Sequence, residues 1–547
     1  MVDDEARATG MSLSSNFRRT HSPLPEVEIR DVAPVGRAVL WLSLLRRMGL
    51  RAIVDSLMRS ESEISHGEVV EALVLNRLTS PRPLYRIEEW ARQVGLTALT
   101  GHEATRLNDD RIGRTLDVLV DRVADVQAAL TAHMVGEFEV KTTDVNYDTT
   151  TAFFEGFHEG SELAARGHSK DGKADHKQIK LAIVTSEDGQ VPLTHITLAG
   201  NVADVTTVPA ALVELRRYLE TDPVVISGDA TMWSQANMDA VARAGGVFLG
   251  PIAMIPSVHS WVCAAKFTTN VSVQLTRMQK AVEYHACVAG RFAVNGVAEA
   301  GTRIVVHDAR RAAEQAEDRR DALERYDVAL NGLRARLNTP RMKTRTAAEK
   351  AVATLAKRHG LAIRYVDVVI QEHGECVAMN WTRDEAKLEA ELGRDGRWPL
   401  VTNQQGLSDD GLCAWAIRRY KLHGRIERDM HLVKGPLELR PIFVQNDDRI
   451  RALVAISVFA LMAMTLLERE GRKALPEQHK NRVPIIARLE ALFASLSIVT
   501  IRLAQDSTIQ RAISPLRKDA QSIVRAMQLS REVYALLAEA VGRVGPS

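Results

Sequence analysis

Residues 143–154 read TDVNYDTTTAFF, and this stretch decides the fold. Up to Thr142 apolar residues recur at helical spacing, whereas from there they alternate with polar residues, which is the period of a strand. Asp144, Asn146 and Asp148 alternate along this strand, so their side chains share one face of it. The chain therefore changes from helix to sheet here, and the first strand presents acids on one face.

Alternating strands and helices follow this first strand. The turn residues Glu187-Asp188-Gly189-Gln190 separate two apolar runs and predict a hairpin. The elements expected after the first strand are strands at 178–186 and 191–198, a helix at 205–219, a buried parallel strand at 223–227, a helix at 234–244 and a strand at 246–252. This order, β-β-β-α-β-α-β, predicts an α/β core of the ribonuclease-H-like type, whose first part covers residues 139–254.

The segments before the sheet predict a tail and a helical domain. Residues 1–36 are polar and interrupted by prolines, which indicates a flexible tail. Residues 37–138 keep helical spacing throughout and predict an all-α amino-terminal domain. Two short helices at 66–78 and 84–94, and a third that begins after Asn108 as its N-cap, suit a helix-turn-helix that reads DNA. Plain packing of three short helices is the alternative.

Beyond residue 254 the apolar pattern of the sheet is interrupted. Residues 255–402 predict an insertion, with a strand-like piece at 302–307. The insertion also holds charged helical stretches at 309–337 and 346–358, which we expect to pair as a helical hairpin. The core then resumes in residues 403–447 with one further helix.

The last segment, residues 448–547, predicts a helical carboxy-terminal part and is the candidate surface for dimerisation. It contains the longest apolar run of the chain, at 453–467. This run is shorter than the roughly 20 residues that a membrane-spanning helix needs. We therefore expect a buried helix there.

Composition excludes several classes of protein. The 547 residues allow roughly three or four domains. The formal net charge is only +2, so a nucleic-acid surface requires local segregation of charge. The four cysteines form no C-x-x-C pair, and the amino terminus has no apolar signal segment, so we expect a cytoplasmic protein without a zinc module. The sequence contains no nucleotide-binding phosphate loop, G-x-S-x-G elbow or H-E-x-x-H motif, so no nucleotide cofactor is expected.

Three acids are the candidate metal ligands. Asp148 lies on the first strand, and Asp229 lies just past the parallel strand, where open α/β sheets hold their ligands. Two carboxylates on neighbouring strands can hold divalent cations, and a third acid, Glu427, can complete a site for two metal ions. Each acid taken alone is also explained as a solvated turn residue or a helix cap.

The helix expected around Glu427 is polar along one stripe. Tyr420, His423, Glu427 and Lys434 lie at offsets of −7, −4, 0 and +7, so all four fall near one side of a helix. Residues 411–440 also hold seven Lys or Arg against three acids, a net charge of +4. A phosphate-binding surface around a metal ligand accounts for this stripe. A solvated basic face is the alternative reading.

These residues resemble a known signature. The pattern Tyr420-x2-His423-x3-Glu427-x6-Lys434 is similar in spacing to the Y-x2-R-x3-E-x6-K signature of bacterial cut-and-paste insertion-sequence transposases, whose Glu is the third acid of a DDE triad. Further likeness lies in the first strand around Asp148, in the turns at 167–172 and 200–204, and in residues 107–114. The resemblance spans about residues 40 to 470.

The resemblance implies an activity, a cofactor and partners. The three acids would hold two Mg2+, for which Mn2+ can substitute, in an endonuclease that cuts DNA at the element's ends and joins the freed 3′ hydroxyl to target DNA. Tyr420, His423 and Lys434 would hold DNA phosphates, and members of the group pass through a DNA hairpin. The implied partners are the terminal inverted repeats, the target DNA and a second copy of the chain in a synapsed homodimer, with no membrane involved.

The chain departs from the family pattern at two positions. His423 replaces the signature Arg, which removes a bidentate phosphate contact and makes any contact there dependent on pH near neutrality. Ala230 follows Asp229 where a glycine is common, which puts the local backbone in question. Trp233 and Trp261 could stack on unpaired bases, but core packing explains both, and neither is assigned.

Two other functions remain open. A ribonuclease-H-like nuclease or Holliday-junction resolvase could use the same acids without strand transfer, although the insertion and helical flanks exceed what a bare nuclease needs. A DNA-binding protein derived from a transposase that no longer cuts is the third reading, and the intact acids weigh against it.

Overall fold

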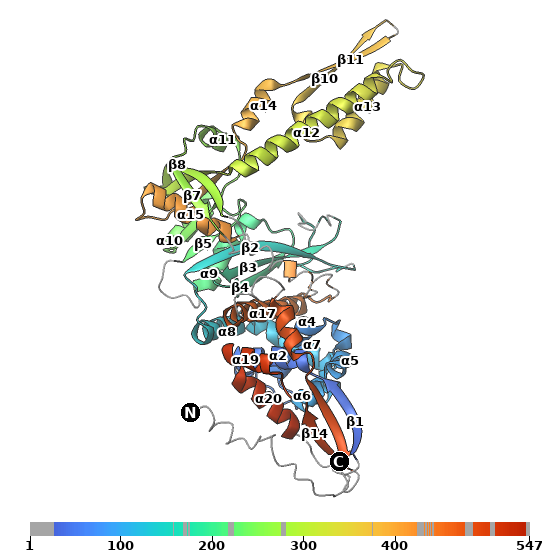
Figure 1. The fold of residues 1–547 in the computed structure, drawn as a ribbon, viewed down its shortest axis with the longest axis vertical. Coiled ribbons are helices and arrows are strands. Elements are labelled where there is room, and N and C mark those ends of the chain that lie inside the picture. The colour runs from blue at the N-terminus through green and yellow to red at the C-terminus, as the bar shows by residue number, and fades with distance from the viewer. Residues whose placement is uncertain are drawn as a thin grey trace.

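The molecule is elongated, with three parts along its long axis (Figure 1). A helical body lies at one end, a large sheet lies in the middle, and a helical projection lies at the other end. The computed structural model describes residues 27–542 except 157, 168–171, 173, 174, 217–223, 275–280, 375, 424–430, 433, 434, 436, 438, 440, 441, 443, 476–484 and 504–508.

One mixed sheet runs through the middle part. Its strand order is β4-β3-β2-β5-β6-β12-β9-β8-β7. β2 pairs antiparallel with β3 and parallel with β5, and β5 pairs parallel with β6. The strands are β2 (Asp144–Phe153), β3 (Gln178–Ser186), β4 (Pro192–Ala199), β5 (Val225–Ser227), β6 (Val247–Pro251), β7 (Thr269–Val273), β8 (Val282–Val294), β9 (Val297–His307) and β12 (Arg397–Thr402). The chain thus has the mixed α/β fold with a large sheet that the sequence predicts.

From β2 to β6 the described elements follow the expected order β-β-β-α-β-α-β. α9 (Val208–Arg216) lies between β4 and β5, and α10 (Gln235–Arg243) lies between β5 and β6. In the predicted turn between β3 and β4, Gly189 has a φ of 88°. A Cβ atom on Gly189 would also come within 2.7 Å of Cδ of Arg469. Both the turn and this close approach therefore require glycine.

The segment 255–402, which the sequence predicts to be an insertion, contributes four strands that extend the sheet. β12 pairs antiparallel with β6 on one side and with β9 on the other, so β7, β8 and β9 continue the same sheet. The hairpin between β8 and β9 turns at Asn295-Gly296, with φ of 50° and 76°. Asn-Gly favours tight hairpin turns because both residues tolerate positive φ. A single helix, α11 (Pro256–Cys263), separates β6 from β7.

The chain between β9 and β12 forms the projection (Figure 1). Here α12 (Ala309–Arg334) contacts α13 (Arg345–Arg358), as expected of the helical hairpin, and α13 contacts β10 (Val366–His373). β11 (Cys376–Arg383) pairs antiparallel with β10, and α14 (Glu385–Leu392) follows. An apolar cluster including Leu323, Tyr326 and Leu330 forms a separate core. At the base, Nη2 of buried Arg319 lies 2.6 Å from both carboxylate oxygens of Asp395.

The helical body contains the amino-terminal helices. They are α2 (Gly36–Arg47), α3 (Leu50–Leu57), α4 (His66–Thr79), α5 (Ile87–Gln93), α6 (Leu96–Thr100), α7 (Asp109–Leu119) and α8 (Val123–Phe138). The predicted N-cap is confirmed, because the Asn108 side chain accepts a hydrogen bond from the Arg111 amide at 3.0 Å. In α4 every residue except Glu68 is buried, so α4 is a core helix and offers no face to DNA.

The two chain ends differ from the sequence prediction. Residues 27–34 were expected in a flexible tail, but they form β1 (Val27–Pro34), which pairs antiparallel with β13 (Ser497–Leu503). The carboxy-terminal part was expected to be helical throughout, but β13 and β14 (Ile509–Ile513) complete a three-stranded sheet. α18 (Ile485–Phe493) and α20 (Ser530–Gly542) contact α2, and α19 (Lys518–Ala526) contacts both of them. The two ends of the chain therefore fold together as one body.

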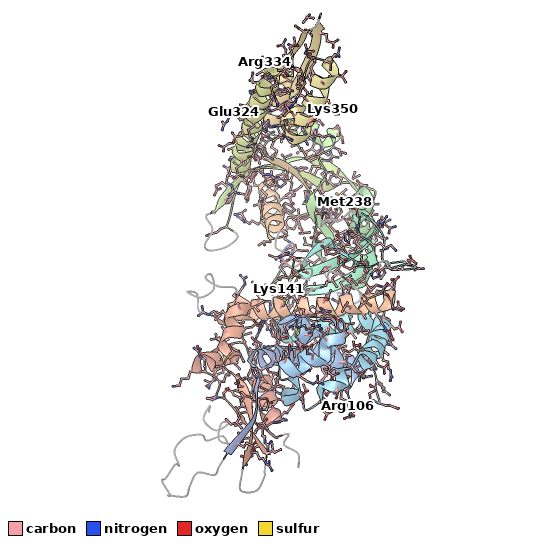
Figure 2. The ribbon with its side chains drawn as sticks, turned by 90° about the vertical axis from the view of Figure 1, so that its right-hand side faces the viewer. Arg106, Lys141, Met238, Glu324, Arg334 and Lys350 are labelled. Atoms are coloured by element: carbon pink, nitrogen blue, oxygen red, sulfur yellow. The ribbon has the colours of Figure 1, made fainter. Side chains whose placement is uncertain are left out.

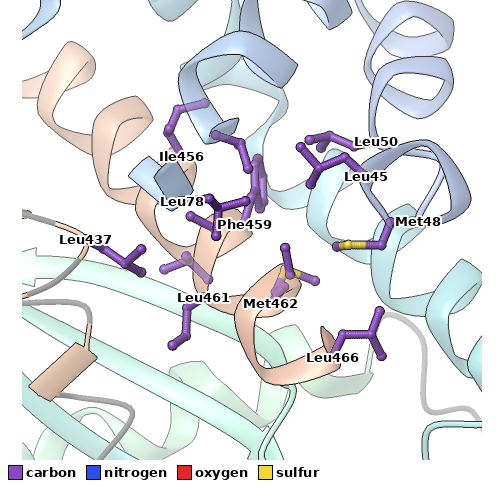
Figure 3. Packing of buried hydrophobic residues seen from close by; sticks show 14 of the residues in the cluster. Leu45, Met48, Leu50, Leu78, Leu437, Ile456, Phe459, Leu461, Met462 and Leu466 are labelled. Carbon is purple, nitrogen blue, oxygen red and sulfur yellow. The ribbon is translucent and has the colours of Figure 1, made fainter. Parts of the chain in front are cut away.

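A long apolar helix connects this body to the sheet. α17 (Asp447–Ala474) contacts α2, α4 and α7 of the body and β4 of the sheet. Figure 3 shows Phe459, Met462 and Leu466 of α17 among apolar side chains of the body such as Leu45 and Met48. In length and composition α17 could span a membrane, but 89% of its most apolar window is buried inside the protein. The prediction of a buried helix is confirmed.

Candidate active site

The pairing of β2 with β5 determines where the first two acids lie. The strands run parallel, and Asn146 is the partner of Ser227 in their register. Continuing this register by two residues places Asp148 level with Asp229. Both carboxylates also raise the pKa of the Tyr147 phenol, although burial of that phenol is the larger cause. Asp148 thus lies on β2, and Asp229 lies two residues beyond the end of β5, the strand that pairs parallel with β2.

Asp148 and Asp229 are both half-buried. Oδ1 of Asp148 accepts a hydrogen bond from the amide of Thr149 at 2.7 Å. Oδ1 of Asp229 accepts from the amide and hydroxyl of Thr231, at 3.0 and 2.6 Å. Asp229 thus shapes the turn that follows β5, as the alternative reading of a turn residue expects. That role does not exclude a ligand role, since a carboxylate has two oxygens.

The turn after Asp229 does not require the glycine that the family pattern suggests. Residues 230–232 are all described, and none has a positive φ. Trp233 lies beneath this turn, where its Nε1 donates to the Gly228 carbonyl at 3.3 Å. A Cβ atom on Gly250 of β6 would lie only 2.0 Å from this nitrogen. Trp233 is therefore a packing residue of the site, and Ala230 fits the backbone.

Asp144 does not join the other acids, because it pairs with an arginine of α15 (Asp409–His423). Nε of Arg419 lies 3.1 Å from Oδ1 of Asp144, and its Nη1 lies 3.2 Å from Oε2 of Glu187. These contacts are ionic, since the N–H groups do not align with the carboxylates as hydrogen bonds. Burial lowers the pKa of Arg419, and the two carboxylates oppose that shift. Arg419 thus fastens α15 to the strand that carries Asp148.

Sequence reasoning missed Arg419 because it was counted among the basic residues of a phosphate-binding or solvated face. Its side chain is only 6% exposed. Lys421 from the same count is also engaged inside the protein, with its Nζ 4.5 Å from the centre of the Trp398 ring. The available signal was helical spacing, because Leu412 and Ala416 precede Arg419 on the buried side of α15.

The remaining predicted site residues lie at the edge of the described chain or outside it. Tyr420 is half-buried and packs against the apolar cluster that includes Ala416 and Ile417. His423 is the last described residue of α15, and its side chain is not described. Glu427 and Lys434 lie outside the described residues. Tyr420 is therefore the one predicted phosphate contact whose packing is known.

The chemistry of the donor set suits hard divalent cations. The carboxylate of Asp148 on β2 and that of Asp229 just beyond β5 offer oxygen ligands of the type that Mg2+ and Mn2+ prefer. Within the described residues, no group of three or more His, Cys, Asp or Glu side chains is positioned to hold a metal ion. Glu427, the third acid predicted from the sequence, lies outside the residues that were searched.

Comparisons with known proteins identify the family. The model of a family described as "Transposase DDE domain" matches residues 147–463, more than half of the chain. The chain therefore belongs to the transposase DDE domain family. Proteins of this family generally use a divalent metal ion, and the mixed sheet fits a ribonuclease-H-like transposase core. A second model, described as a domain of unknown function (DUF4277), matches residues 38–130 in the helical body.

Other comparisons are more distant. No curated protein matches the chain. Among solved structures, the piggyBac transposase synaptic complex with hairpin DNA is similar at 8% sequence identity and a TM-score of 0.36. That likeness covers 94% of this chain and 86% of the other. At such a distance it supports no inference about this chain.

Proposed function

We propose that this protein is a cut-and-paste transposase of a bacterial insertion sequence. It cleaves DNA at the ends of the element in a metal-dependent reaction and joins the freed ends to target DNA. The observation that supports this proposal is the parallel pairing of β2, which carries Asp148, with β5, which ends two residues before Asp229, within the segment that matches the transposase family. Acids on and just beyond adjacent parallel strands suit phosphoryl chemistry, which depends on positioning and charge neutralisation.

In this proposal Asp148, Asp229 and Glu427 hold two Mg2+ ions, for which Mn2+ can substitute. Such ions activate an attacking oxygen and stabilise a leaving oxygen during displacement at phosphorus. The carboxylates contribute oxygen ligands to these ions. Arg419 contributes by pairing with Asp144, which holds α15 next to β2, the strand that carries Asp148.

Tyr420, His423 and Lys434 are the proposed contacts to DNA phosphates. A histidine in the position of the signature arginine holds a phosphate strongly only when its ring is protonated. DNA binding through this position should therefore weaken as pH rises through neutrality. The proposed DNA partners are the terminal inverted repeats and the target DNA, bound by a homodimer in the bacterial cytoplasm.

Cleavage of a supercoiled plasmid that carries both ends of the source element tests this proposal. Wild type, Asp229→Asn and Glu427→Gln are compared with and without Mg2+ or Mn2+. The matched control is Glu283→Gln, which neutralises an exposed acid of β8. We expect metal-dependent release of the element by wild type and the control, and no release by the two site variants.

Each alternative gives a different result in the same assay. Binding of the ends without cleavage by wild type would indicate a DNA-binding relative that no longer cuts. Cleavage without joining to target DNA would indicate a nuclease or resolvase. Equal cleavage by wild type and the site variants would show that the metal site lies on other residues.

A further inference from the structure

Positive charge is concentrated in the outer half of the projection. Residues 334–364 contain nine lysines or arginines and a single acid, Glu349, in a chain whose net charge is only +2. The inner part of α12 differs, because residues 309–327 contain five arginines against six acids. We call the nine cations the outer basic surface: Arg334, Arg336, Arg341, Lys343, Arg345, Lys350, Lys357, Arg358 and Arg364. The second part of the helical hairpin is thus strongly basic, whereas the first part of α12 is nearly neutral.

Every residue of the outer basic surface is exposed. Arg345 pairs with Glu349, with Nε 2.7 Å from Oε1, and Arg334 lies over the Trp381 ring. Among the residues that the structure describes, no carboxylate pairs with the other seven cations of this surface. In the inner part of α12, by contrast, arginines pair with acids, as Arg320 does with Glu317. Glu372 of β10 is a second acid next to this surface, with its Oε1 3.2 Å from the Arg345 amide, so most but not all of the positive charge lacks a paired carboxylate.

The fold distributes these cations from the outer end of the projection back along α12. The end of α12, the turn after it and the beginning of α13 lie at the outer end, and α13 then runs back beside α12, where His359 packs on Tyr326. Figure 2 shows Arg334 of α12 and Lys350 of α13 in this part of the molecule. Lys350 and Lys357 are two helical turns apart on one exposed stripe, with Ala353 and Thr354 between them. No acid interrupts that stripe.

Helix stability does not explain this charge pattern. Lys357 and Arg358 lie in the last turn of α13, where cations stabilise the helix dipole. Lys343 and Arg345, however, lie at the beginning of α13, where the dipole disfavours cations, and the first turn has no acid. Cations at both ends of one helix point to a ligand outside the chain. Their side chains are flexible and spaced along an extended surface, which suits a row of phosphates.

We propose that the outer basic surface binds the sugar-phosphate backbone of duplex DNA without reading its sequence. This inference rests on the proposed function, because that DNA is the duplex continuous with the one bound at Asp148 and Asp229. The projection lies at the opposite end of the molecule from the helical body, beyond the sheet that carries those acids (Figure 1). The outer basic surface therefore extends the contact with DNA away from the reacting phosphate and contributes affinity rather than specificity.

The test uses the full-length protein and a labelled duplex, with binding followed by fluorescence anisotropy over a range of salt concentrations. One variant removes four unpaired cations of the outer basic surface: Arg341→Gln, Lys343→Gln, Lys350→Gln and Lys357→Gln. The matched control removes four exposed cations from the inner part of α12: Arg310→Gln, Arg311→Gln, Arg320→Gln and Arg325→Gln. Both variants lose the same charge from the same projection. All eight side chains are exposed, so neither variant disturbs a core.

We expect the outer variant to reduce the slope of log affinity against log salt by about 3.6, since each of the four lost phosphate contacts contributes about 0.9. Its affinity at low salt should fall at least about tenfold, and the control should change the slope by less than about 1. Equal effects of the two variants, or no effect of the outer variant, would overturn the inference. Tighter binding of single-stranded DNA or RNA than of duplex would also overturn it.

Failure of the inference and failure of the proposed function are distinguishable. If the wild type cleaves element ends but the salt slope of the outer variant is unchanged, the proposed transposase function stands and the outer basic surface does not bind DNA. If duplex binding is reduced in the outer variant but the wild type does not cleave DNA, the outer basic surface binds DNA and the proposed transposase function is wrong.

Discussion

Arg419 allows the link between α15 and the strand of Asp148 to be tested in free-energy terms. Truncation in Arg419→Ala removes two buried methylenes, Cγ and Cδ, which at about 0.8 kcal/mol each amount to about 2 kcal/mol. It also removes ion pairs with Asp144 and Glu187, whose side chains are each 33% exposed and therefore screened by solvent. Such partly exposed pairs contribute about 1 kcal/mol together. The expected loss of local stability is about 3 kcal/mol.

Hydrogen exchange measured by mass spectrometry reports this loss locally. A loss of about 3 kcal/mol corresponds to a fall of roughly a hundredfold in protection of the α15 amides. Arg419→Met keeps the packing and removes only the charge, so its protection should fall by roughly fivefold, corresponding to about 1 kcal/mol. Amides of α13 in the distant projection serve as the internal control. Unchanged protection of α15 in Arg419→Ala would refute the role of Arg419 in fastening this helix.

Three further substitutions probe other parts of the fold. Burial raises the pKa of Glu71 to about 7, so above pH 4.5 the folded chain keeps a proton that the unfolded chain releases. The free energy of unfolding, measured in urea, should therefore fall by about 3 kcal/mol as the pH rises from 4.5 to 7. Glu71→Gln should abolish that fall. Phe459→Ala in α17 should cost about 3–5 kcal/mol in the same assay, because the ring is fully buried, whereas a loss below about 1 kcal/mol would contradict its packing. Asp395→Ala leaves the buried Arg319 guanidinium without a carboxylate, which should destabilise the base of the projection by about 3–5 kcal/mol. Limited proteolysis should then release the projection faster than in the wild type. An unchanged cleavage rate would show that this pair does not stabilise the base.

The parts of the fold that sequence predicted are those with a local signal. The change of period at Thr142 located β2, and the turn residues 187–190 located the hairpin between β3 and β4. The N-cap at Asn108 and the buried helix at 453–467 were also predictable, because each depends on residues close in sequence. Local periodicity and turn chemistry were sufficient because each of these elements is determined within a few residues.

The parts that sequence missed depend on partners far away in the chain. β1 is a strand because it pairs with β13, with Val27 opposite Leu503. Residues 27–34 contain no local signal that predicts this pairing. The continuation of the sheet depends on β12 closing between β6 and β9. One local signal was overlooked, since Asn295-Gly296 between two apolar runs predicts the hairpin of β8 and β9.

The candidate site was predictable to a similar extent. Alternation along the first strand suggested Asp148, and the end of the parallel strand suggested Asp229. Helical spacing could have indicated that Arg419 is buried, but its partners Asp144 and Glu187 lie on a different part of the chain and were not predictable. The signature around Glu427 was inferred from residue spacing alone, and Glu427 lies outside the described residues.

Iron-mediated cleavage of the protein backbone locates the metal site without relying on catalysis. Fe2+ bound in place of Mg2+, with ascorbate and the element's end DNA present, generates radicals that cut the chain beside the ion, and mass spectrometry maps the cuts. We predict cuts next to Asp148 and Asp229 and near Glu427, all lost in Asp148→Asn and retained in Glu283→Gln. Cuts elsewhere in the chain, or cuts that persist unchanged in Asp148→Asn, would contradict a shared metal site on β2 and β5.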